Sequence, residues 1–211
     1  MERGNQARLR PPPWLANQAP HRYKAADRDW NSYYRTRLRH SISGWDVKFN
    51  LLDRIESVSD TRLVAVKFVT LAEEYLADHF PTFPVLPGVL MLEALVQSAG
   101  WLLHRNSGFA KSMAVLKEAR NVRYGTFVAP GHSLRVDVEL TKTSDAGGVF
   151  KASGSVDGNP AVSAKLELAY FNLSERQKEI GEEIDRRLVE HHRGRWAVLS
   201  QTDHMEPLRE G

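Results

Sequence analysis

The stretch from residue 79 to residue 100 constrains this chain more than any other. It reads HFPTFPVLPGVLMLEALVQSAG. Proline fixes φ and keeps the preceding residue out of the helical region, so the segment before Gly88 is expected to be extended. The prolines concerned are Pro81, Pro84 and Pro87. Pro-Gly suits the first turn of a helix, and the run from 89 to 103 is apolar on nearly all sides. Such a run predicts a buried helix.

Glu93 and Gln97 are the polar exceptions in this helix, four residues apart on one face. A carboxylate in apolar surroundings costs several kcal/mol unless a partner or a proton compensates it. The first turn at Gly88 offers free N–H groups and a positive dipole end to an oxygen atom. Together with His79 on the stiff loop, these groups supply a base, oxyanion donors and a buried carboxyl. Those are the parts that proton removal next to a carbonyl requires.

Two other interpretations of the stretch are open. A membrane span needs about 20 apolar residues, whereas this run is shorter, contains Glu93 and opens with Pro-Gly. No membrane span is therefore expected. In the second interpretation, Glu93 is paired with Gln97 inside an ordinary core helix and His79 is an ordinary loop histidine.

The same residues resemble the signature of the 3-hydroxyacyl-acyl-carrier-protein dehydratases of type II fatty acid synthesis. The matching residues are His79-Phe80-Pro81, Pro84, Pro87-Gly88-Val89 and Glu93-Ala94-Leu95-x-Gln97. The catalytic His and Glu of that family lie fourteen positions apart, as His79 and Glu93 do here. The resemblance extends over roughly residues 45 to 172. It includes Phe49-Asn50-Leu51-Leu52-Asp53-Arg54, and Val122-Arg123-Tyr124 through Val128-Ala129-Pro130-Gly131.

Three positions depart from the family pattern. Thr82 stands where the family usually has Gly, Phe127 where it has Pro, and His132 where Asp is common. A β-branched residue cannot adopt backbone angles that only Gly tolerates. Thr82 could therefore re-aim the loop that carries His79.

The resemblance implies an α+β hotdog fold, in which an antiparallel sheet wraps around one long buried central helix. It implies dehydration of a (3R)-hydroxyacyl thioester on acyl carrier protein to the trans-2-enoyl thioester, without a cofactor. The Gly88 N–H would bind the thioester carbonyl, His79 would remove the α proton, and Glu93 would protonate the departing hydroxyl. The candidate walls of an acyl tunnel are Phe80, Phe83, Val89, Leu90 and Gln97.

The resemblance also implies a shared site. About 9 Å of helix separates Pro87 from Glu93 at 1.5 Å per residue, and in the family one subunit supplies the His and the other the Glu. A homodimer is expected, or a trimer of dimers. Two alternatives are a hotdog acyl thioesterase, which does not need the His-Phe-Pro loop, and a catalytically silent acyl-binding hotdog subunit.

Strand patterns surround the helix. Alternating apolar residues and β formers fill 45–70, and five later segments also resemble strands. These are 113–116, 121–124, 134–143, 149–156 and 161–171. Turn signals between them predict antiparallel hairpins at Pro130-Gly131, Gly147-Gly148 and Asp157-Gly158-Asn159-Pro160.

The first 42 residues are expected to form a flexible basic arm, before a hotdog domain over 43–172. Residues 1–40 hold nine Arg or Lys and three Asp or Glu, a net charge of +6 against +3 for all 211 residues. No nucleic-acid motif is present, so no nucleic-acid partner is expected. The chain has no cysteine and no signal peptide, which favours the cytoplasm. Acyl carrier proteins are acidic, and the candidate docking residues are Lys117, Arg123, Arg135 and the arm itself; the alternative is an inert arm.

Residues 173–211 are expected to form an amphipathic helix and a tail. Ser174 to Gln177 fits a capping box, and Ile180, Ile184 and Leu188 form a stripe. His191-His192 lacks a third ligand, so these histidines are expected to be solvated and no metal site is predicted.

Overall fold

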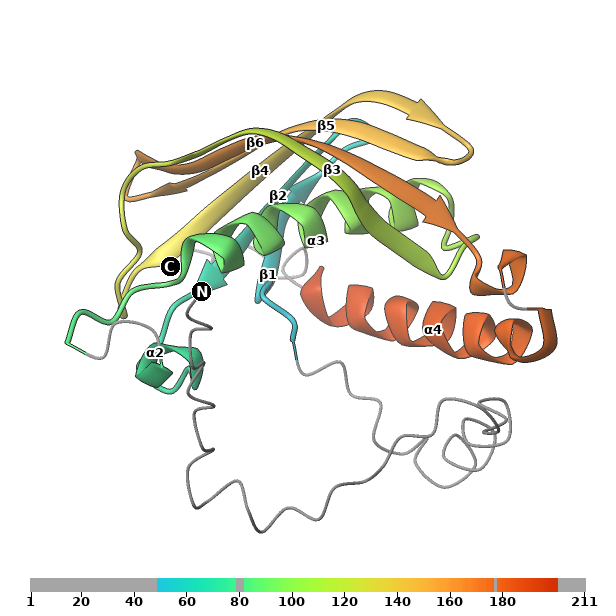
Figure 1. The fold of residues 1–211 in the computed structure, drawn as a ribbon, viewed down its shortest axis with the longest axis horizontal. Coiled ribbons are helices and arrows are strands. Elements are labelled where there is room, and N and C mark those ends of the chain that lie inside the picture. Colours follow the sequence, from blue (N-terminus) through green and yellow to red (C-terminus); the bar gives the residue numbers. More distant parts are fainter. Residues whose placement is uncertain (1–48, 79–81, 177, 201–211) are drawn as a thin grey trace, which may run out of the picture. The chain divides into compact units, whose positions relative to one another are not determined.

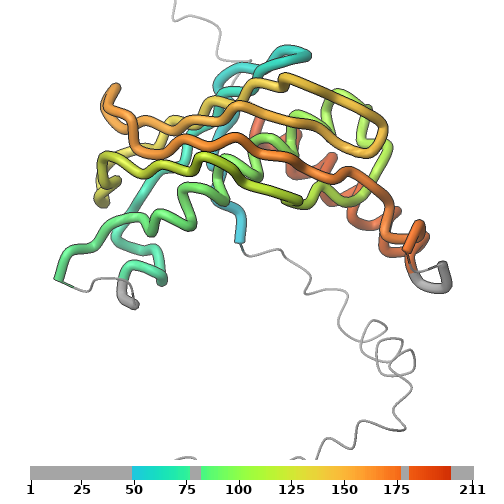
Figure 2. Tube along the Cα trace, turned by 45° about the horizontal axis from the view of Figure 1, so that its top comes forward, coloured from blue at the N-terminus to red at the C-terminus, as the bar shows by residue number. Residues whose placement is uncertain are grey.

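The computed structural model describes residues 49–78, 82–176 and 178–200. Its centre is a six-stranded antiparallel sheet in the order β1-β2-β4-β5-β6-β3, which curls around the long helix α3 (Figure 1). Figure 2 shows the same arrangement from a tilted direction, with α3 along the concave side of the sheet. The elements are β1 (Arg54–Val58), β2 (Arg62–Phe68), α2 (Tyr75–Asp78), α3 (Gly88–Asn106), β3 (Met113–Tyr124), β4 (Ser133–Ser144), β5 (Gly147–Val156), β6 (Asn159–Phe171), the short 3-10 helix η3 (Leu173–Glu175) and α4 (Lys178–Leu199).

The strands follow the period of two that a half-covered sheet requires. In β4, Leu134, Val136 and Val138 are buried toward α3, while Arg135 and the residues alternating with it face outward. β5 and β6 are joined by Asp157-Gly158, and both residues have positive φ (50° and 79°). That geometry fits a two-residue type I′ hairpin turn, whose twist matches that of the strands.

Helix α3 supplies the other half of the core. Ala94, Leu95, Ala99 and Leu102 have no exposed surface and pack against the inner face of the sheet, where Phe150 is equally buried. The helix begins at Gly88, as Pro-Gly predicts, and its C-cap is Ser107, followed by Gly108 at φ 63°. A residue that tolerates positive φ is the usual end of a helix.

One predicted strand assignment is wrong, and two others are confirmed but belong to a single strand. The described residues 49–53 form no strand, because the Leu51 N–H donates to the Gln97 side chain of α3 rather than to a sheet neighbour. Segments 113–116 and 121–124 are one continuous strand, β3, in which register shifts absorb the residues between them. Asn121 has a positive φ (52°) at the second shift. A bulge of this kind bends a strand without ending it.

Helix α4 packs on the side of α3 that faces away from the sheet (Figure 1). Trp196 and His192 contact the Trp101 ring, with ring centroids 6.1 and 5.7 Å apart, and Leu199 is buried. The helix predicted after residue 173 is therefore present, but its capping box is not the expected one. Asn172 and Glu175 form the box at η3, and α4 begins only at Lys178.

The prediction that His192 is solvated is also wrong. Its ring lies 4.5 Å from the ring of His104, which is 5% exposed, and its Nε2 lies 3.0 Å from the Ser112 carbonyl oxygen. Burial lowers the pKa of His192, and burial and then His192 lower the pKa of His104 to about 3. Within the described ranges, no group of three or more potential metal ligands occurs.

Candidate active site

The N-terminus of α3 is held in place by the connection between β3 and β4. The Leu86 N–H donates to the Val128 carbonyl over 2.8 Å, and Val85, Leu86 and Val128 are all buried. Pro87 is the N-cap and has no side-chain oxygen to bind the first-turn donors. Among the described residues nothing accepts a hydrogen bond from the Gly88 N–H, so this donor is available to a ligand.

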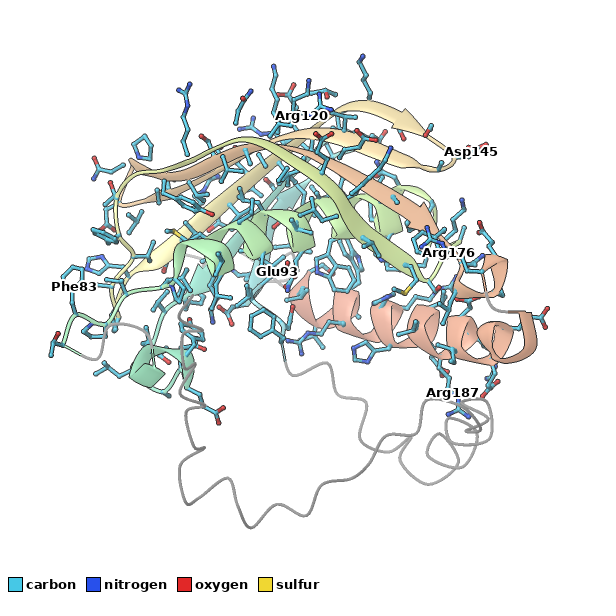
Figure 3. The ribbon with its side chains drawn as sticks, viewed as in Figure 1. Phe83, Glu93, Arg120, Asp145, Arg176 and Arg187 are labelled. Carbon is cyan, nitrogen blue, oxygen red and sulfur yellow. The ribbon has the colours of Figure 1, made fainter. Side chains whose placement is uncertain are left out.

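Glu93 lies on α3 facing away from the sheet (Figure 3). It is half-buried in the single chain, less enclosed than the apolar run predicts. Gln97 donates from Nε2 to Glu93 Oε1 over 3.0 Å and to the Phe49 carbonyl over 3.1 Å. The Gln97 Oε1 accepts the Leu51 N–H over 3.0 Å, which fixes the orientation of the amide. Gln97 therefore binds one oxygen of Glu93, and the other oxygen has no hydrogen bond to a described residue.

Exposed aromatic side chains surround the same helix end. Phe83 and Phe127 form an edge-to-face pair with centroids 5.6 Å apart, at 55% and 61% exposure. The Tyr124 ring lies against Gly88, where an added Cβ would be 3.1 Å from Cε1 of Tyr124. Val89 is 69% exposed and lies one residue further along the helix. This rim is apolar enough to bind an acyl thioester.

The structure describes all of the sequence-predicted site residues except His79 and Phe80. Gly88, Val89, Leu90, Glu93 and Gln97 all lie on α3, and Leu90 is half-buried. His79 and Phe80 lie outside the described residues.

A buried ion pair supports the segment that leads to residue 79. Lys67 lies on the inner face of β2, 5% exposed, with Nζ 2.5 Å from Glu73 Oε1 and 3.7 Å from Asp53 Oδ2. Asp53 Oδ2 also accepts the Phe68 N–H. Tyr75 opens α2 next to this pair, and its pKa is raised first by burial, then by Glu73 and Asp53. No motif marks Lys67 or Glu73; the available signal is a lysine within a strand that is otherwise apolar from 63 to 69.

The three residues that depart from the family pattern have different surroundings in the structure. Thr82 is exposed and directly follows residues 79–81, which lie outside the described residues. Phe127 is one half of the exposed aromatic pair. His132 Nδ1 lies 2.8 Å from Asp157 Oδ2, which links the turn before β4 to the β5–β6 turn.

An antiparallel sheet wrapped around a long central helix defines a hotdog-fold protein. The chain belongs to the FabA-like domain family, which matches residues 46–165. In the part of the chain that the structure describes, no helix has the length and apolar character to cross a membrane.

Similar proteins agree with this assignment. The 3-hydroxyacyl-[acyl-carrier-protein] dehydratase FabZ of Clostridium perfringens is 36% identical over 121 residues, covering 57% of this chain and 87% of that protein. FabZ of Exiguobacterium sibiricum is 38% identical over 122 residues, with the same shares covered. Among solved structures, the dehydratase heterocomplex ApeI:P from Xenorhabdus doucetiae superposes with a TM-score of 0.51 at 24% identity, covering 62% of this chain and 89% of that one. This last likeness shows the hotdog fold.

Proposed function

We propose that this chain dehydrates a (3R)-hydroxyacyl thioester, carried on acyl carrier protein, to the trans-2-enoyl thioester in fatty acid biosynthesis. It is then a hydro-lyase that acts in the cytoplasm. Membership of the FabA-like family and the similarity to FabZ dehydratases support the reaction. The observation that carries it is that one helix presents both a Gly88 N–H without a described acceptor and the Glu93 carboxylate, which Gln97 orients. Gly88 and Glu93 lie five positions apart, about 7.5 Å along the helix axis.

In the proposed mechanism, the Gly88 N–H donates to the thioester carbonyl oxygen and stabilises the charge that develops there. Neutral His79 takes the α proton, and the electrons of that C–H bond form the new double bond. The bond from the β carbon to its hydroxyl breaks, and Glu93 gives a proton to the leaving oxygen, which departs as water. Gln97 holds Glu93 in place through Oε1.

We further propose that the site is completed between two copies of the chain, as a homodimer or a trimer of dimers. The exposed face of α3 around Val89 and Glu93 supports this. β3 supports it too, because it is a twelve-residue strand at the edge of the sheet. Long unpaired edges are usually covered in native proteins. A second copy could cover both.

Product analysis of the purified full chain with a small soluble 3-hydroxyacyl thioester tests the reaction. Conversion to the 2-enoyl thioester is expected without added metal or nucleotide, whereas free acid would indicate a thioesterase. His79→Ala and Glu93→Ala are each expected to lose at least about 100-fold in kcat. Unchanged rates in both variants would mean that the site is misassigned.

Mixing the two inactive variants tests the shared site. A mixed dimer of His79→Ala and Glu93→Ala chains contains one intact site if the residues come from different subunits. Activity should therefore return on mixing. Mixed dimers that are verified by mass and remain inactive would contradict a shared site.

The carrier is the partner that the proposed substrate requires. Of the three body residues predicted to dock it, Lys117 and Arg135 are neutralised by Glu167 and Glu56, at 2.5 and 2.9 Å. Arg123 has no described ion pair. The arm at residues 1–42 lies outside the described residues, and its contribution is tested by deleting it and comparing carrier-bound with small substrate.

A further inference from the structure

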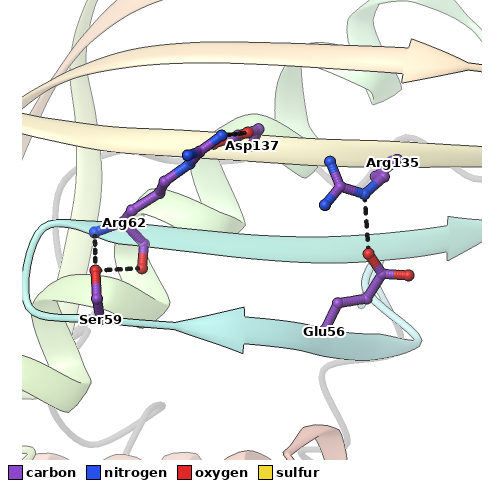
Figure 4. Close-up of polar contacts among 5 residues, drawn as sticks. All are labelled: Glu56, Ser59, Arg62, Arg135 and Asp137. Carbon is purple, nitrogen blue, oxygen red and sulfur yellow. Dashed lines mark hydrogen bonds and ion pairs between the residues drawn. The ribbon is translucent and has the colours of Figure 1, made fainter. Parts of the chain in front are cut away.

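The outer face of the sheet, which faces away from α3, carries two kinds of cations. Four are neutralised by carboxylates on the same or nearby strands, as Figure 4 shows for two of the pairs. The pairs are Arg62 with Asp137, Arg135 with Glu56, Lys117 with Glu167, and Arg120 with Glu118. In Figure 3, Arg120 lies on this outer face, on the opposite side of the sheet from Glu93.

Lys151, Lys165 and Arg123 are cations of the second kind, because none of them forms an ion pair with a described residue. Lys151 of β5 stands directly opposite Lys165 of β6, and Lys165 stands directly opposite Arg120 of β3. Like charges that face each other across strands destabilise a sheet. Lys151 also stands opposite Glu139 of β4, and Arg120 is paired with Glu118, so the sheet compensates the like charges around Lys165 only in part. An external anion would compensate them further.

These cations border a shallow hollow of about 780 Å³. Its middle is formed by small residues, among them Ser153 and Ser163, which are directly opposite each other on β5 and β6. The charged residues of the lining are Arg62, Arg123, Lys151, Lys165, Asp137 and Glu139. Asp137 is bound by Arg62, whose hydrogen bond lowers the pKa of that carboxyl. The hollow therefore presents a net positive surface over a floor of hydroxyl groups.

The end of β3 connects the hollow to the candidate active site. Arg123 and Tyr124 are consecutive and pair with Ser163 and Val162 of β6, so their side chains point to opposite faces of the sheet. Tyr124 lies against Gly88. The end of β3 therefore borders the hollow on its outer face, through Arg123, and contacts the start of α3 on its inner face, through Tyr124.

We propose that this hollow is the docking surface of the acidic carrier protein, whose carboxylates bind Lys151, Lys165 and Arg123. The inference rests on the proposed function, because the carrier is the partner only if the substrate is carrier-bound. Charge complementarity selects a protein rather than a nucleic acid. A phosphate backbone carries closely spaced charge and would meet Glu139, whereas an acidic protein segment can place a neutral or basic side chain there. Such a surface raises the association rate and weakens as salt rises.

The test compares two double variants that lose the same net charge. Lys151→Gln/Lys165→Gln changes the hollow, and Arg186→Gln/Arg187→Gln changes the exposed side of α4, where both arginines pair with Glu183. For each, kcat/KM is measured on a carrier-bound 3-hydroxyacyl substrate and on a small soluble thioester with the same acyl group. Binding of labelled holo-carrier protein is measured by fluorescence anisotropy at low and raised salt.

The hollow variant is expected to lose about tenfold in carrier Kd and in carrier-bound kcat/KM, the scale of one close charge pair. Its kcat/KM on the small thioester and its Tm should stay close to the wild-type values, because neither lysine forms an ion pair with a described residue. The α4 variant should keep the wild-type values, and Arg123→Gln alone should show a smaller loss.

Three results would overturn the docking surface: carrier Kd unchanged in the hollow variant, equal losses in both double variants, or an equal loss on the small thioester. A wild-type protein that dehydrates neither substrate contradicts the proposed function instead. The anisotropy measurement separates the two failures, since it reports binding without turnover.

Discussion

Gln97 holds Glu93 by one carboxylate oxygen, with the Gln97 Nε2 to Glu93 Oε1 distance at 3.0 Å. The Gln97 amide is itself oriented by the Leu51 N–H and the Phe49 carbonyl. The segment before β1 is thereby connected to the proposed proton donor through a single side chain. Small losses of alignment in such a relay reduce the rate of proton transfer more than they reduce binding.

Gln97→Leu should therefore lower kcat by about tenfold with little change in KM, a smaller loss than the 100-fold or more typical of the general acid itself. Ser98→Ala is the matched control on the same helix, because among the described residues the Ser98 hydroxyl bonds only the Ala94 carbonyl. Steady-state kinetics on the small thioester checks both. Equal effects of the two substitutions would attribute the loss to a general disturbance of α3.

Asp185→Asn should loosen α4. The Asp185 carboxylate is 8% exposed and accepts hydrogen bonds from the Ser112 hydroxyl and from the Leu173 and Ser174 N–H groups. Burial acts to raise its pKa, but hydrogen bonds from Ser112, Ser174 and Leu173 outweigh it, so the pKa is lowered overall. Bonds to a charged acceptor contribute about 1.5–3 kcal/mol each, so a loss of a few kcal/mol in unfolding free energy is expected.

Denaturant unfolding and hydrogen exchange over α4 measure this effect. Asp145→Asn is the control, because Asp145 lies in the exposed β4–β5 loop (Figure 3) and only its backbone carbonyl forms a described hydrogen bond. Its effect should stay within about 0.5 kcal/mol. Unchanged exchange of α4 in Asp185→Asn would show that the carboxylate does not anchor the helix.

Acid should destabilise the docked helix through His104. Its pKa is lowered from 6.5 to about 3 in the fold, first by burial and then by His192. The unfolded chain therefore binds the proton more readily, and stability falls as pH drops from 6.5 toward 3. It is independent of this group above about pH 7. Each pH unit inside that window costs about 1.4 kcal/mol at most.

Tm measured against pH tests the acid effect. His104→Phe keeps an aromatic ring that cannot be protonated, so its Tm should decline less between pH 6.5 and 4. His191→Gln, at the exposed neighbour of His192, should retain the wild-type decline. Parallel curves for wild type and His104→Phe would assign the acid sensitivity to another group.

Gly88→Ala should reduce activity without unfolding the chain. The new Cβ would lie 3.1 Å from the Tyr124 ring, which is half exposed and can shift. Alanine restricts the unfolded chain, which adds about 0.4–1 kcal/mol of stability and offsets the crowding. A several-fold loss in kcat/KM with unchanged Tm is expected. Adding Tyr124→Ser should recover part of that loss, and no recovery would exclude the displaced ring as its cause.

The elements with strong local signals were predictable from sequence. The start of α3 at Gly88 follows from the fixed φ of Pro87 and the free donors of a first turn, and the Asp157-Gly158 turn follows from residues that tolerate positive φ. The stretch around Phe49 to Leu51 was not predictable, because an alternating apolar pattern fits any extended segment. The position of this stretch depends on the hydrogen bond from the Leu51 N–H to the Gln97 side-chain amide, which is 46 residues away in the sequence.

The environment of His192 and the exposure of Glu93 depend on contacts between distant segments. His192 is enclosed only because α4 meets Trp101 and His104, and sequence spacing contains no sign of that contact. The capping box was predictable in principle, since Asn172 to Glu175 has the same spacing as Ser174 to Gln177. Glu93 is half-buried because it lies on the side of α3 that faces away from the sheet, although the apolar run predicts burial.

The position of α4 has a practical consequence for anyone who shortens this chain. The family match ends at residue 165 and β6 at Phe171, so a truncated expression product would naturally stop there. Such a product would present the Trp101 indole and the His104 imidazole to water and would leave the Ser112 hydroxyl without its carboxylate. A minimal folding unit should instead extend through Leu199, which is 2% exposed at the end of α4.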